Sequence, residues 1–229
     1  SRDMKTVLVS TRLAIVDLQH GDQPLRSPRG AVLIVNGEIY NAPELRSQFK
    51  TYPFATSSDC EVIFPLFETY GFDFARHLRG MFAIALYDEN SKQLILSRDR
   101  FGIKPLYVME GGGRVAFSSE LGALLDSGLA ERDIDTVARS ELLQLRHVAG
   151  DKTIIQGIHR LPPGKTLVIE NGVICRAQTW GARNKVTKPQ TPVSRYCGLV
   201  TASPQRWIET FDTIIRDSVR VHLQLLVPT

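Results

Sequence analysis

The residues with the clearest chemical potential lie in a short polar segment that follows an apolar run. The run is Ala31–Val35, and Asn36-Gly37 comes directly after it. A side-chain amide and a glycine N–H held together at a strand end are two donors that can stabilise the oxyanion of a tetrahedral acyl intermediate. The same Asn-Gly pair is also the strongest short signal for a tight hairpin turn, because both central residues need φ > 0. Both interpretations stay open here, since a turn can present its donors.

Two charged residues could complete a site of amino-acid size. Arg12 interrupts the strand-like segment Thr6–Asp17. A lone arginine in such a run is usually an edge residue, but inside a pocket its guanidinium would bind a carboxylate bidentately. Asp59 opens a helical pattern, where the helix dipole favours an acidic side chain. Beside a pocket the same carboxylate would accept a substrate ammonium group, although the local sequence favours the helix-dipole interpretation.

The elements that must position these residues are short strands and a separate set of helices. Apolar runs and turn signals predict strands over Ala31–Val35, Met81–Asp88, Gln93–Asp99 and Val115–Phe117, and a hairpin over Thr166–Arg176 around Asn171-Gly172. Helical spacing predicts helices over Pro43–Phe49, from a Ser58/Glu61 capping box to Tyr70, over Ser119–Asp126 and over Ile134–Leu145. Strands that cluster apart from helices favour an α+β fold with antiparallel sheets over a βαβ nucleotide fold.

Charged residues between the predicted strands and the next apolar segment form a second notable group. They lie in Arg98–Tyr107, which reads R-D-R-F-G-I-K-P-L-Y. So many charges beside apolar strands predict an interlocked polar network. The later run Gly111-Gly112-Gly113 lacks the Lys and Ser/Thr of a phosphate loop and is interpreted as a flexible tip.

Composition excludes several other classes of protein. The chain has 229 residues, of which 43% are apolar, and its net charge of +4 comes from interspersed residues rather than a basic stripe, which argues against nucleic acid as a partner. Its three cysteines are far apart and its five histidines lack ligand spacing, so we expect neither a disulfide framework nor a metal site. There is no apolar run long enough to cross a membrane and no signal peptide. We therefore expect no membrane partner and a cytoplasmic location.

The C-terminal part of the sequence changes in character. Residues 181–204 mix proline and glycine with polar and basic residues, which is typical of a linker. Residues Gln205–Leu223 have the apolar spacing of an amphipathic helix. Such a helix needs a surface on which to bury its apolar face.

Several blocks of the sequence together resemble the glutaminase domain of class II glutamine amidotransferases, most closely the glutamine-hydrolysing asparagine synthetases. The blocks are T-R-L-A-I-V-D, V-N-G-E-I-Y-N, S-D-C-E, G-M-F-A-I-A-L-Y-D, R-D-R-F-G-I-K-P-L-Y, A-F-S-S-E and L-P-P-G, and they cover about Thr6 to Trp180 in order. The resemblance implies an N-terminal-nucleophile hydrolase fold, a four-layer αββα sandwich of two antiparallel sheets. It also implies a glutaminase domain over 1–180 and the start of a synthetase domain over 205–229.

The resemblance assigns roles to residues of this chain. It implies that Arg12 holds the α-carboxylate of glutamine and Asp59 its α-ammonium group, and that Asn36 and Gly37 form the oxyanion hole. The remaining pocket residues would be Leu13, Ile15, Val16 and Glu38. In the family, ammonia released from glutamine passes to a second domain, which activates aspartate with ATP and magnesium.

Two parts of the family pattern are not found in this sequence. The first strand with its cysteine nucleophile should precede T-R-L-A-I-V-D, and the S-G-G-x-D-S pyrophosphate loop should follow the last helix. Ser1 is too near Arg12 to replace that cysteine, and Cys60 has no free α-amino group to act as base. We therefore expect the fold to lack its first strand, and we assign the chain no catalytic residue, no metal and no cofactor.

The expected partners follow from the same resemblance. They are glutamine, a synthetase domain that uses ATP and magnesium, and, as an open alternative, a second copy of the chain. The competing hypothesis is a catalytically inactive amidotransferase-like module that serves only to bind a partner.

Overall fold

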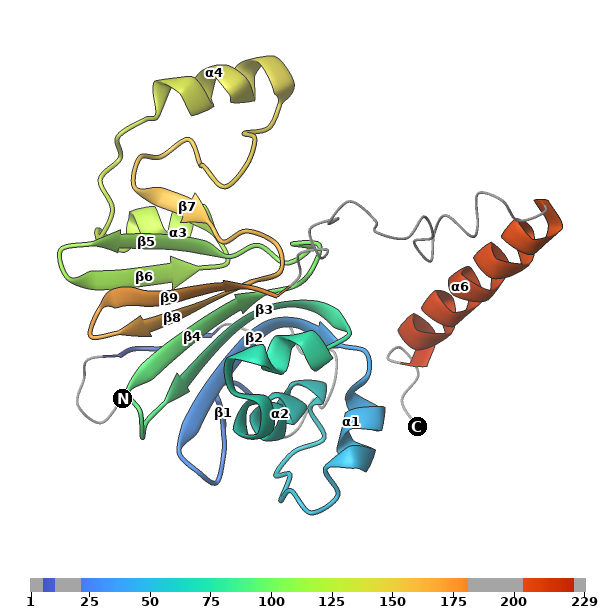
Figure 1. Ribbon diagram of the computed structural model, residues 1–229. Coiled ribbons are helices and arrows are strands. Elements are labelled where there is room, and N and C mark those ends of the chain that lie inside the picture. The colour runs from blue at the N-terminus through green and yellow to red at the C-terminus, as the bar shows by residue number, and fades with distance from the viewer. Residues whose placement is uncertain (1–5, 11–21, 181–203, 225–229) are drawn as a thin grey trace, which may run out of the picture. The chain divides into compact units, whose positions relative to one another are not determined.

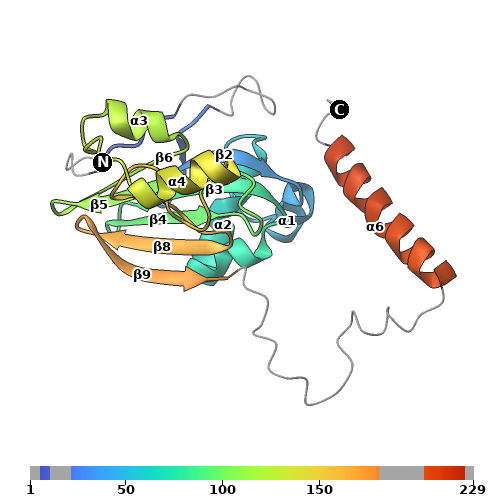
Figure 2. The ribbon, with the colours of Figure 1, turned by 90° about the horizontal axis from the view of Figure 1, so that it is seen from above.

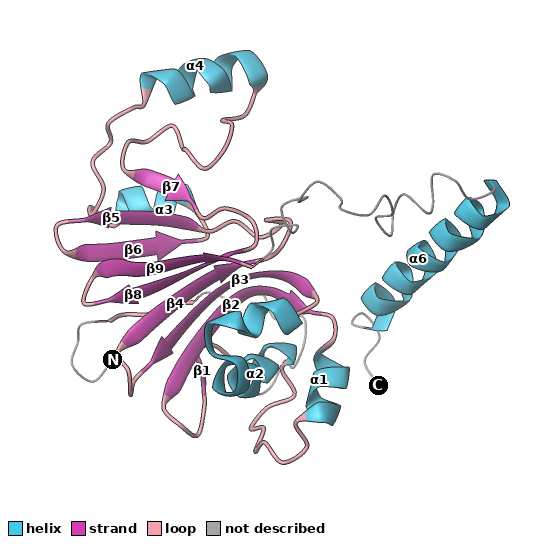
Figure 3. Cartoon of the chain, in the orientation of Figure 1, coloured by secondary structure: helices cyan, strands magenta, loops and turns pink. Residues whose placement is uncertain are grey.

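The computed structural model describes residues 6–10, 22–180 and 204–224. The chain divides into two compact units, residues 1–181 and residues 182–229, and each is described here by itself. Figure 1 labels the elements, and Figure 3 distinguishes helices, strands and loops. Residues 6–10 carry no helix or strand, and the rest of the predicted strand region Thr6–Asp17 lies outside the described residues.

The larger sheet of the first unit has six antiparallel strands in the order β1-β2-β3-β4-β8-β9. They are β1 (Leu25–Arg26), β2 (Ala31–Ile39), β3 (Gly80–Asp88), β4 (Gln93–Arg98), β8 (Lys165–Glu170) and β9 (Val173–Thr179). The predicted hairpins over β3–β4 and β8–β9 are confirmed. Asn171 and Gly172 both have positive φ, 50° and 78°, which suits the tight turn between β8 and β9. In the view from above, β8 and β9 lie side by side at one edge (Figure 2).

The smaller sheet has three antiparallel strands in the order β6-β5-β7. They are β5 (Tyr107–Gly111), β6 (Arg114–Ser118) and β7 (Ile158–Arg160). The sequence predicted β6, whereas it gave no signal for β5 or β7.

The helices of the first unit fall into two groups, one for each sheet. The first group follows β2 along the chain, and the second follows β6 (Figure 1). The α-helices and 3₁₀ helices are α1 (Ala42–Gln48), η1 (Asp59–Val62), α2 (Ile63–Tyr70), η2 (Gly71–His77), α3 (Leu121–Asp126) and α4 (Thr136–Leu145). Pro65 lies in the first turn of α2, where a missing N–H costs nothing, and the 3₁₀ helix η1 comes directly before that turn.

Three apolar clusters show how the layers pack. One face of the larger sheet packs against α1, η1, α2 and η2 through side chains such as Leu33, Phe64 and Phe82. Its other face packs against the smaller sheet, for example through Leu96 and Val108. The outer face of the smaller sheet packs against α3. The described residues thus form helix, sheet, sheet and helix layers, which confirms the predicted α+β sandwich of two antiparallel sheets.

In the second unit the described residues form the long helix α6 (Pro204–Gln224), which confirms the amphipathic helix predicted over Gln205–Leu223. Its described apolar side chains are exposed: Ile208, Phe211, Ile214, Ile215 and Val219. The predicted linker lies almost wholly outside the described residues, so its character stays a prediction.

Candidate functional site

The Asn36-Gly37 pair lies inside strand β2 and not in a turn. Asn36 is opposite Ala83 and Gly37 is opposite Phe82 in the antiparallel register with β3. The hairpin interpretation of Asn-Gly is therefore wrong here. A Cβ at Gly37 would lie 2.0 Å from the carbonyl oxygen of Met81, and φ is +150°, so glycine is needed for close approach of the two strands.

Along β2, successive backbone N–H and C=O groups point alternately toward β3 and toward the opposite edge of the strand. Tyr40 N–H continues the pairing toward the β3 side by donating to Arg79 O at 2.7 Å. Val35 and Ile39 point the other way: Val35 N–H donates to Gln23 Oε1 at 2.7 Å, and Ile39 N–H donates to Asp59 Oδ2 at 2.6 Å. Because backbone groups of a strand repeat every two residues, Gly37 N–H also points away from β3, midway between those two contacts.

The side chains of the same segment alternate between the faces of the sheet. Val35 and Ile39 belong to the core under α1 and α2, whereas Ile34 packs toward the smaller sheet. Asn36 and Glu38 share the face of Ile34 because successive strand side chains point to opposite faces. Asn36 is exposed, so its carboxamide is accessible next to the Gly37 N–H.

Asp59 meets the end of β2 from the helical layer. It is the first residue of η1 and is 8% exposed. Its carboxylate accepts Ile39 N–H at Oδ2 and the Cys60 thiol at Oδ1, at 2.6 and 3.7 Å. Burial raises the pKa of Asp59 above its usual value, and the hydrogen bonds from Ile39 and Cys60 offset part of that rise. Asp59 at the start of η1 thus also contacts the strand that carries Asn36 and Gly37.

The start of η1 is held by a buried glutamate rather than by a capping box. Ser58 does cap the helix, accepting Cys60 N–H at 3.4 Å. Glu61 instead accepts the N–H groups of Ala55 and Thr56 at 2.6 and 2.8 Å, and lies 3.5 Å from Arg46. The predicted contact from the Glu61 side chain back to the Ser58 N–H is therefore wrong, because the Glu61 carboxylate is bound by the loop before η1 and by Arg46 of α1.

The predicted polar network around Arg98 and Asp99 is confirmed. Asp99 is fully buried and accepts the N–H groups of Phe101, Ile103 and Lys104 at 3.0 Å each. A fourth N–H, from Phe82, lies 3.4 Å from its Oδ2. Since Phe82 pairs with Gly37, this network fixes the strand against which the Gly37 backbone rests.

Arg98 holds the other side of the same loop. Its guanidinium donates to three carbonyl oxygens, those of Lys104, Leu161 and Gly102, at 2.7, 2.6 and 2.8 Å. Burial lowers the pKa of Arg98, and the nearby Asp99 carboxylate opposes that change. The loop 99–104 is thereby tied to both sheets.

The structure brings four of the predicted site residues together and leaves four untested. Asn36, Gly37 and Glu38 lie at the end of β2, with Asp59 bonded to the next residue along that strand. Arg12, Leu13, Ile15 and Val16 lie outside the described residues, so their roles stay predictions. The sequence analysis missed Gln23, because a side chain that pairs with a distant backbone leaves no local pattern.

Two properties of the described ranges 6–10, 22–180 and 204–224 bear on other functions. Among those residues, no group of three or more His, Cys, Asp or Glu side chains could hold a metal ion. No helix there is both long and apolar enough to cross a lipid bilayer.

Comparison with known families identifies the kind of domain. A family model described as a glutamine amidotransferase domain matches residues 1–180. The chain belongs to this glutamine amidotransferase domain family. The match includes β2, η1 and the other strands described in the first unit, so the Asn36-Gly37 segment and Asp59 are parts of an amidotransferase domain.

Relatives of the amidotransferase domain include putative and named asparagine synthetases. A putative glutamine-hydrolysing asparagine synthetase of Mycobacterium bovis is 34% identical over 226 residues, which are 93% of this chain and 33% of that protein. The glutamine-hydrolysing asparagine synthetase 2 of Oryza sativa is 51% identical over 121 residues, covering 52% of this chain and 20% of that protein. The corresponding Bacillus subtilis protein is 44% identical over 123 residues, 53% and 16% of the two chains. The chain thus spans a third or less of these relatives.

Among solved structures, the glutamine phosphoribosylpyrophosphate amidotransferase of Bacillus subtilis is similar. It matches with a TM-score of 0.49 and 22% identity, and the match covers 69% of this chain and 31% of that one.

Proposed function

We propose that the amidotransferase domain binds L-glutamine at the end of β2 and supplies ammonia to a synthetase domain. In this proposal glutamine becomes glutamate and ammonia, and the ammonia reaches aspartate that has been activated with ATP and magnesium. The match over residues 1–180 and the similarity to glutamine-hydrolysing asparagine synthetases support it. We also propose a cytoplasmic location, which fits three widely spaced cysteines.

The observation that carries the proposal is the geometry around Gly37. Its N–H points to the edge of β2, with the exposed Asn36 amide beside it and Asp59 bonded two residues further along. Two such donors suit the carboxamide oxygen of glutamine, which becomes an oxyanion when a nucleophile attacks its carbon atom. This arrangement fits an α-amino acid with a carboxamide side chain, whose α-ammonium group would lie near the Asp59 carboxylate.

Each recognition role requires a particular ionisation state. Asp59 must be ionised to hold an ammonium group, yet burial raises its pKa. A substrate ammonium group beside the carboxylate would reverse that effect, because an opposite charge within a few ångströms favours the ionised form. Glutamine binding is therefore expected to weaken as the pH falls and Asp59 takes up a proton. Arg12 would hold the α-carboxylate, and Leu13, Ile15, Val16 and Glu38 would complete the pocket.

The described cysteines do not provide a nucleophile for this site. Cys60 is buried with its thiol against Asp59, and Cys175 lies on β9. Amidotransferases of this class use an N-terminal cysteine whose own α-amino group is the base, as the resemblance implies. We expect the 229-residue chain to bind glutamine weakly and not to hydrolyse it.

A second candidate function is a module that binds a protein partner without using glutamine. The observation that favours it is the exposed apolar face of α6, with Phe211 and Ile214 at 65% and 60% exposure. The two candidates differ in one measurable property, the specific binding of an amino acid.

Calorimetric titration of the 229-residue chain with L-glutamine tests the proposal. We expect saturable binding that D-glutamine does not reproduce, and a loss of at least about tenfold in affinity in Asp59→Asn, since a charge-assisted contact contributes about 1.5–3 kcal/mol. Asp126→Asn is the matched control, because that carboxylate is exposed and forms an ion pair with the equally exposed Arg132. Equal binding of both enantiomers, no binding, or glutaminase turnover by the chain alone would contradict the proposal.

A further inference from the structure

The edge of β2 that carries the Gly37 N–H is held by a side chain in place of a strand. Strand β1 pairs with β2 at two positions, Leu25 with Leu33 and Arg26 with Val32. In the same antiparallel register the next pairing along that edge would join residue 23 to Val35. There the Gln23 carboxamide makes both contacts: its Nε2–H donates to Val35 O at 3.0 Å, and its Oε1 accepts Val35 N–H at 2.7 Å.

At this position the side chain of Gln23 takes the place of a main-chain group. A primary carboxamide offers one donor and one acceptor at the spacing of a peptide group, so it can complete the ladder with Val35. A backbone ladder continued past Val35 would engage Gly37 next, because edge-facing groups repeat every two residues.

We propose that Gln23 is a positioning residue for the Gly37 oxyanion donor, an inference that rests on the proposed function. Its carboxamide ends the pairing of the β2 edge at Val35, two residues before Gly37. The Asp59 carboxylate holds the same edge at Ile39, two residues after Gly37. The direction of the Gly37 N–H is thus fixed from both sides while the group itself is left for the carboxamide oxygen of glutamine.

Gln23 is the better of the two contacts to test. Asp59 is also assigned to the α-ammonium group, so its substitution would remove a ligand contact and a backbone contact together. Gln23 contacts Val35, which is not one of the residues assigned to glutamine. Its substitution should therefore affect only what depends on the position of the β2 edge.

The test uses the 229-residue chain, two variants and a matched control. Gln23→Met removes both contacts, whereas Gln23→Glu keeps an acceptor for Val35 N–H and loses the donor to Val35 O. Gln93→Met is the control, because Gln93 donates to Glu170 at the β4–β8 pair and does not contact β2. The probes are L-glutamine and L-norvaline, which has the same α-groups but no carboxamide.

We expect the backbone amide resonance of Gly37 to shift in Gln23→Met and, less, in Gln23→Glu, and to stay unchanged in Gln93→Met. Affinity for glutamine should fall about fivefold in Gln23→Met, since one neutral hydrogen bond contributes about 1 kcal/mol, while affinity for norvaline is unchanged. A structural role alone would lower both affinities together.

The outcomes separate the two proposals. A wild-type chain that does not distinguish glutamine from norvaline contradicts the proposed function. A wild-type chain that does distinguish them, with the Gly37 resonance and the affinity ratio unchanged in Gln23→Met, overturns the role of Gln23 alone. If Gln23→Met fails to fold, the same comparison is made with Gln23→Glu.

Discussion

Asp59 and Asp135 stand at the start of two helices and yet have opposite electrostatics. Asp59 is buried and gives its Oδ2 to Ile39 of a distant strand. Asp135 is the N-cap of α4 and accepts Val137 and Ala138 N–H at 2.9 and 3.0 Å, while Lys152 lies 3.7 Å away. Burial raises the pKa of Asp59, whereas the Ala138 N–H and then Lys152 help to lower that of Asp135. An aspartate at a helix start thus belongs to the candidate site in one place and is an ordinary helix cap in the other.

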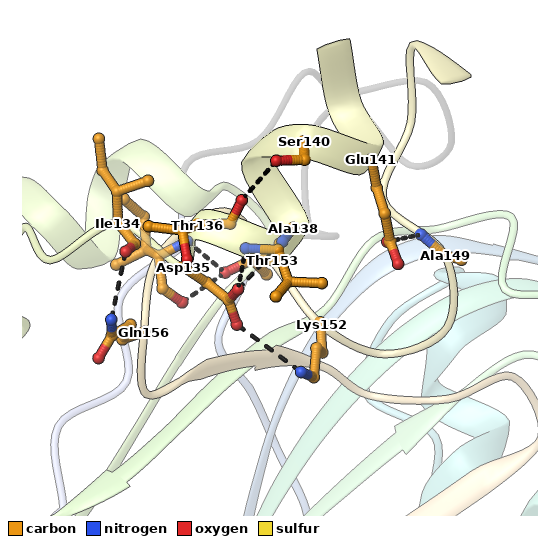
Figure 4. Close-up of polar contacts among 12 residues, drawn as sticks. Ile134, Asp135, Thr136, Ala138, Ser140, Glu141, Ala149, Lys152, Thr153 and Gln156 are labelled. Carbon is orange, nitrogen blue, oxygen red and sulfur yellow. Dashed lines mark hydrogen bonds and ion pairs between the residues drawn. The ribbon is translucent and has the colours of Figure 1, made fainter. Parts of the chain in front are cut away.

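The surroundings of the two aspartates differ in the same way. Around Asp135 the polar contacts are mostly exposed, including Glu141 with Ala149 N–H and Gln156 with Ile134 O (Figure 4). The contacts of Ile39 and Val35 at the end of β2 are buried or half-buried and join distant parts of the chain. We infer that the β2 end tolerates substitution poorly, whereas the α4 region tolerates it well.

The largest expected effect is at the buried network that supports β3. Asp99→Asn replaces one acceptor oxygen with a donor where backbone N–H groups converge. Each carboxylate oxygen accepts two N–H groups, and a buried N–H left without an acceptor costs about 1–3 kcal/mol, so we expect a loss of roughly 4 kcal/mol in the free energy of unfolding. Urea denaturation measures this. A loss no larger than that of the exposed substitution Asp133→Asn would remove the contrast between buried and exposed contacts.

A smaller but still large effect is expected from crowding at Gly37. Gly37→Ala would bring a Cβ to 2.0 Å from Met81 O and 2.7 Å from the Phe82 Cα. The strands must separate, at a cost of about 2–3 kcal/mol, and glutamine binding should be lost with the N–H position. Gly111→Ala is the control, since a Cβ there meets nothing within 4 Å. Equal stability of the two variants in urea would show that the strands do not approach so closely.

The next prediction concerns the pH dependence of the buried aspartate. Because the folded pKa of Asp59 is raised, its contribution to stability is greatest below the ordinary value of 3.8 and falls as the pH rises through the folded pKa. Asp59→Asn should therefore gain stability relative to wild type over that range. Thermal unfolding midpoints from pH 3 to 7 measure the difference. A difference that stays constant with pH would contradict the burial of this carboxylate.

The smallest effect, of opposite sign, is expected at Asp135. Its folded pKa is lowered, so its contribution is present above the ordinary value of 3.8 and is lost as the pH falls through the folded pKa. Asp135→Asn should lose a little stability at neutral pH, lose none in acid, and bind glutamine like wild type. The same midpoint series checks this. A slope with the sign found for Asp59 would mean that the two aspartates do not differ in burial.

Local periodicity predicted those parts of the fold that local sequence determines. The β3–β4 hairpin, α1, α3 and α6 have apolar patterns and turn residues that match their structure. The Asn36-Gly37 turn signal failed because β3 runs opposite it and requires glycine for close packing. The roles of Glu61 and Gln23 were not predicted for another reason. Their partners are backbone groups of Ala55, Thr56 and Val35, which only the folded chain brings near.

The candidate site was predicted largely from the family resemblance rather than from local chemistry. Asp59 by itself looked like a helix-dipole residue, and its contact with Ile39 depends on how η1 packs against β2. The resemblance supplied the grouping of Asn36, Gly37 and Asp59. The structure adds the contacts that hold these residues in place, from Gln23 to Val35 and from Asp59 to Ile39.

The most direct measurement of the central claim is a nitrogen-15 NMR titration of the 229-residue chain with L-glutamine. The account predicts concentration-dependent shifts of the Gly37 backbone amide and the Asn36 side-chain amide, which L-norvaline does not reproduce. Shifts confined to other parts of the chain, or equal shifts with norvaline, would contradict the assignment of these two donors to the glutamine carboxamide.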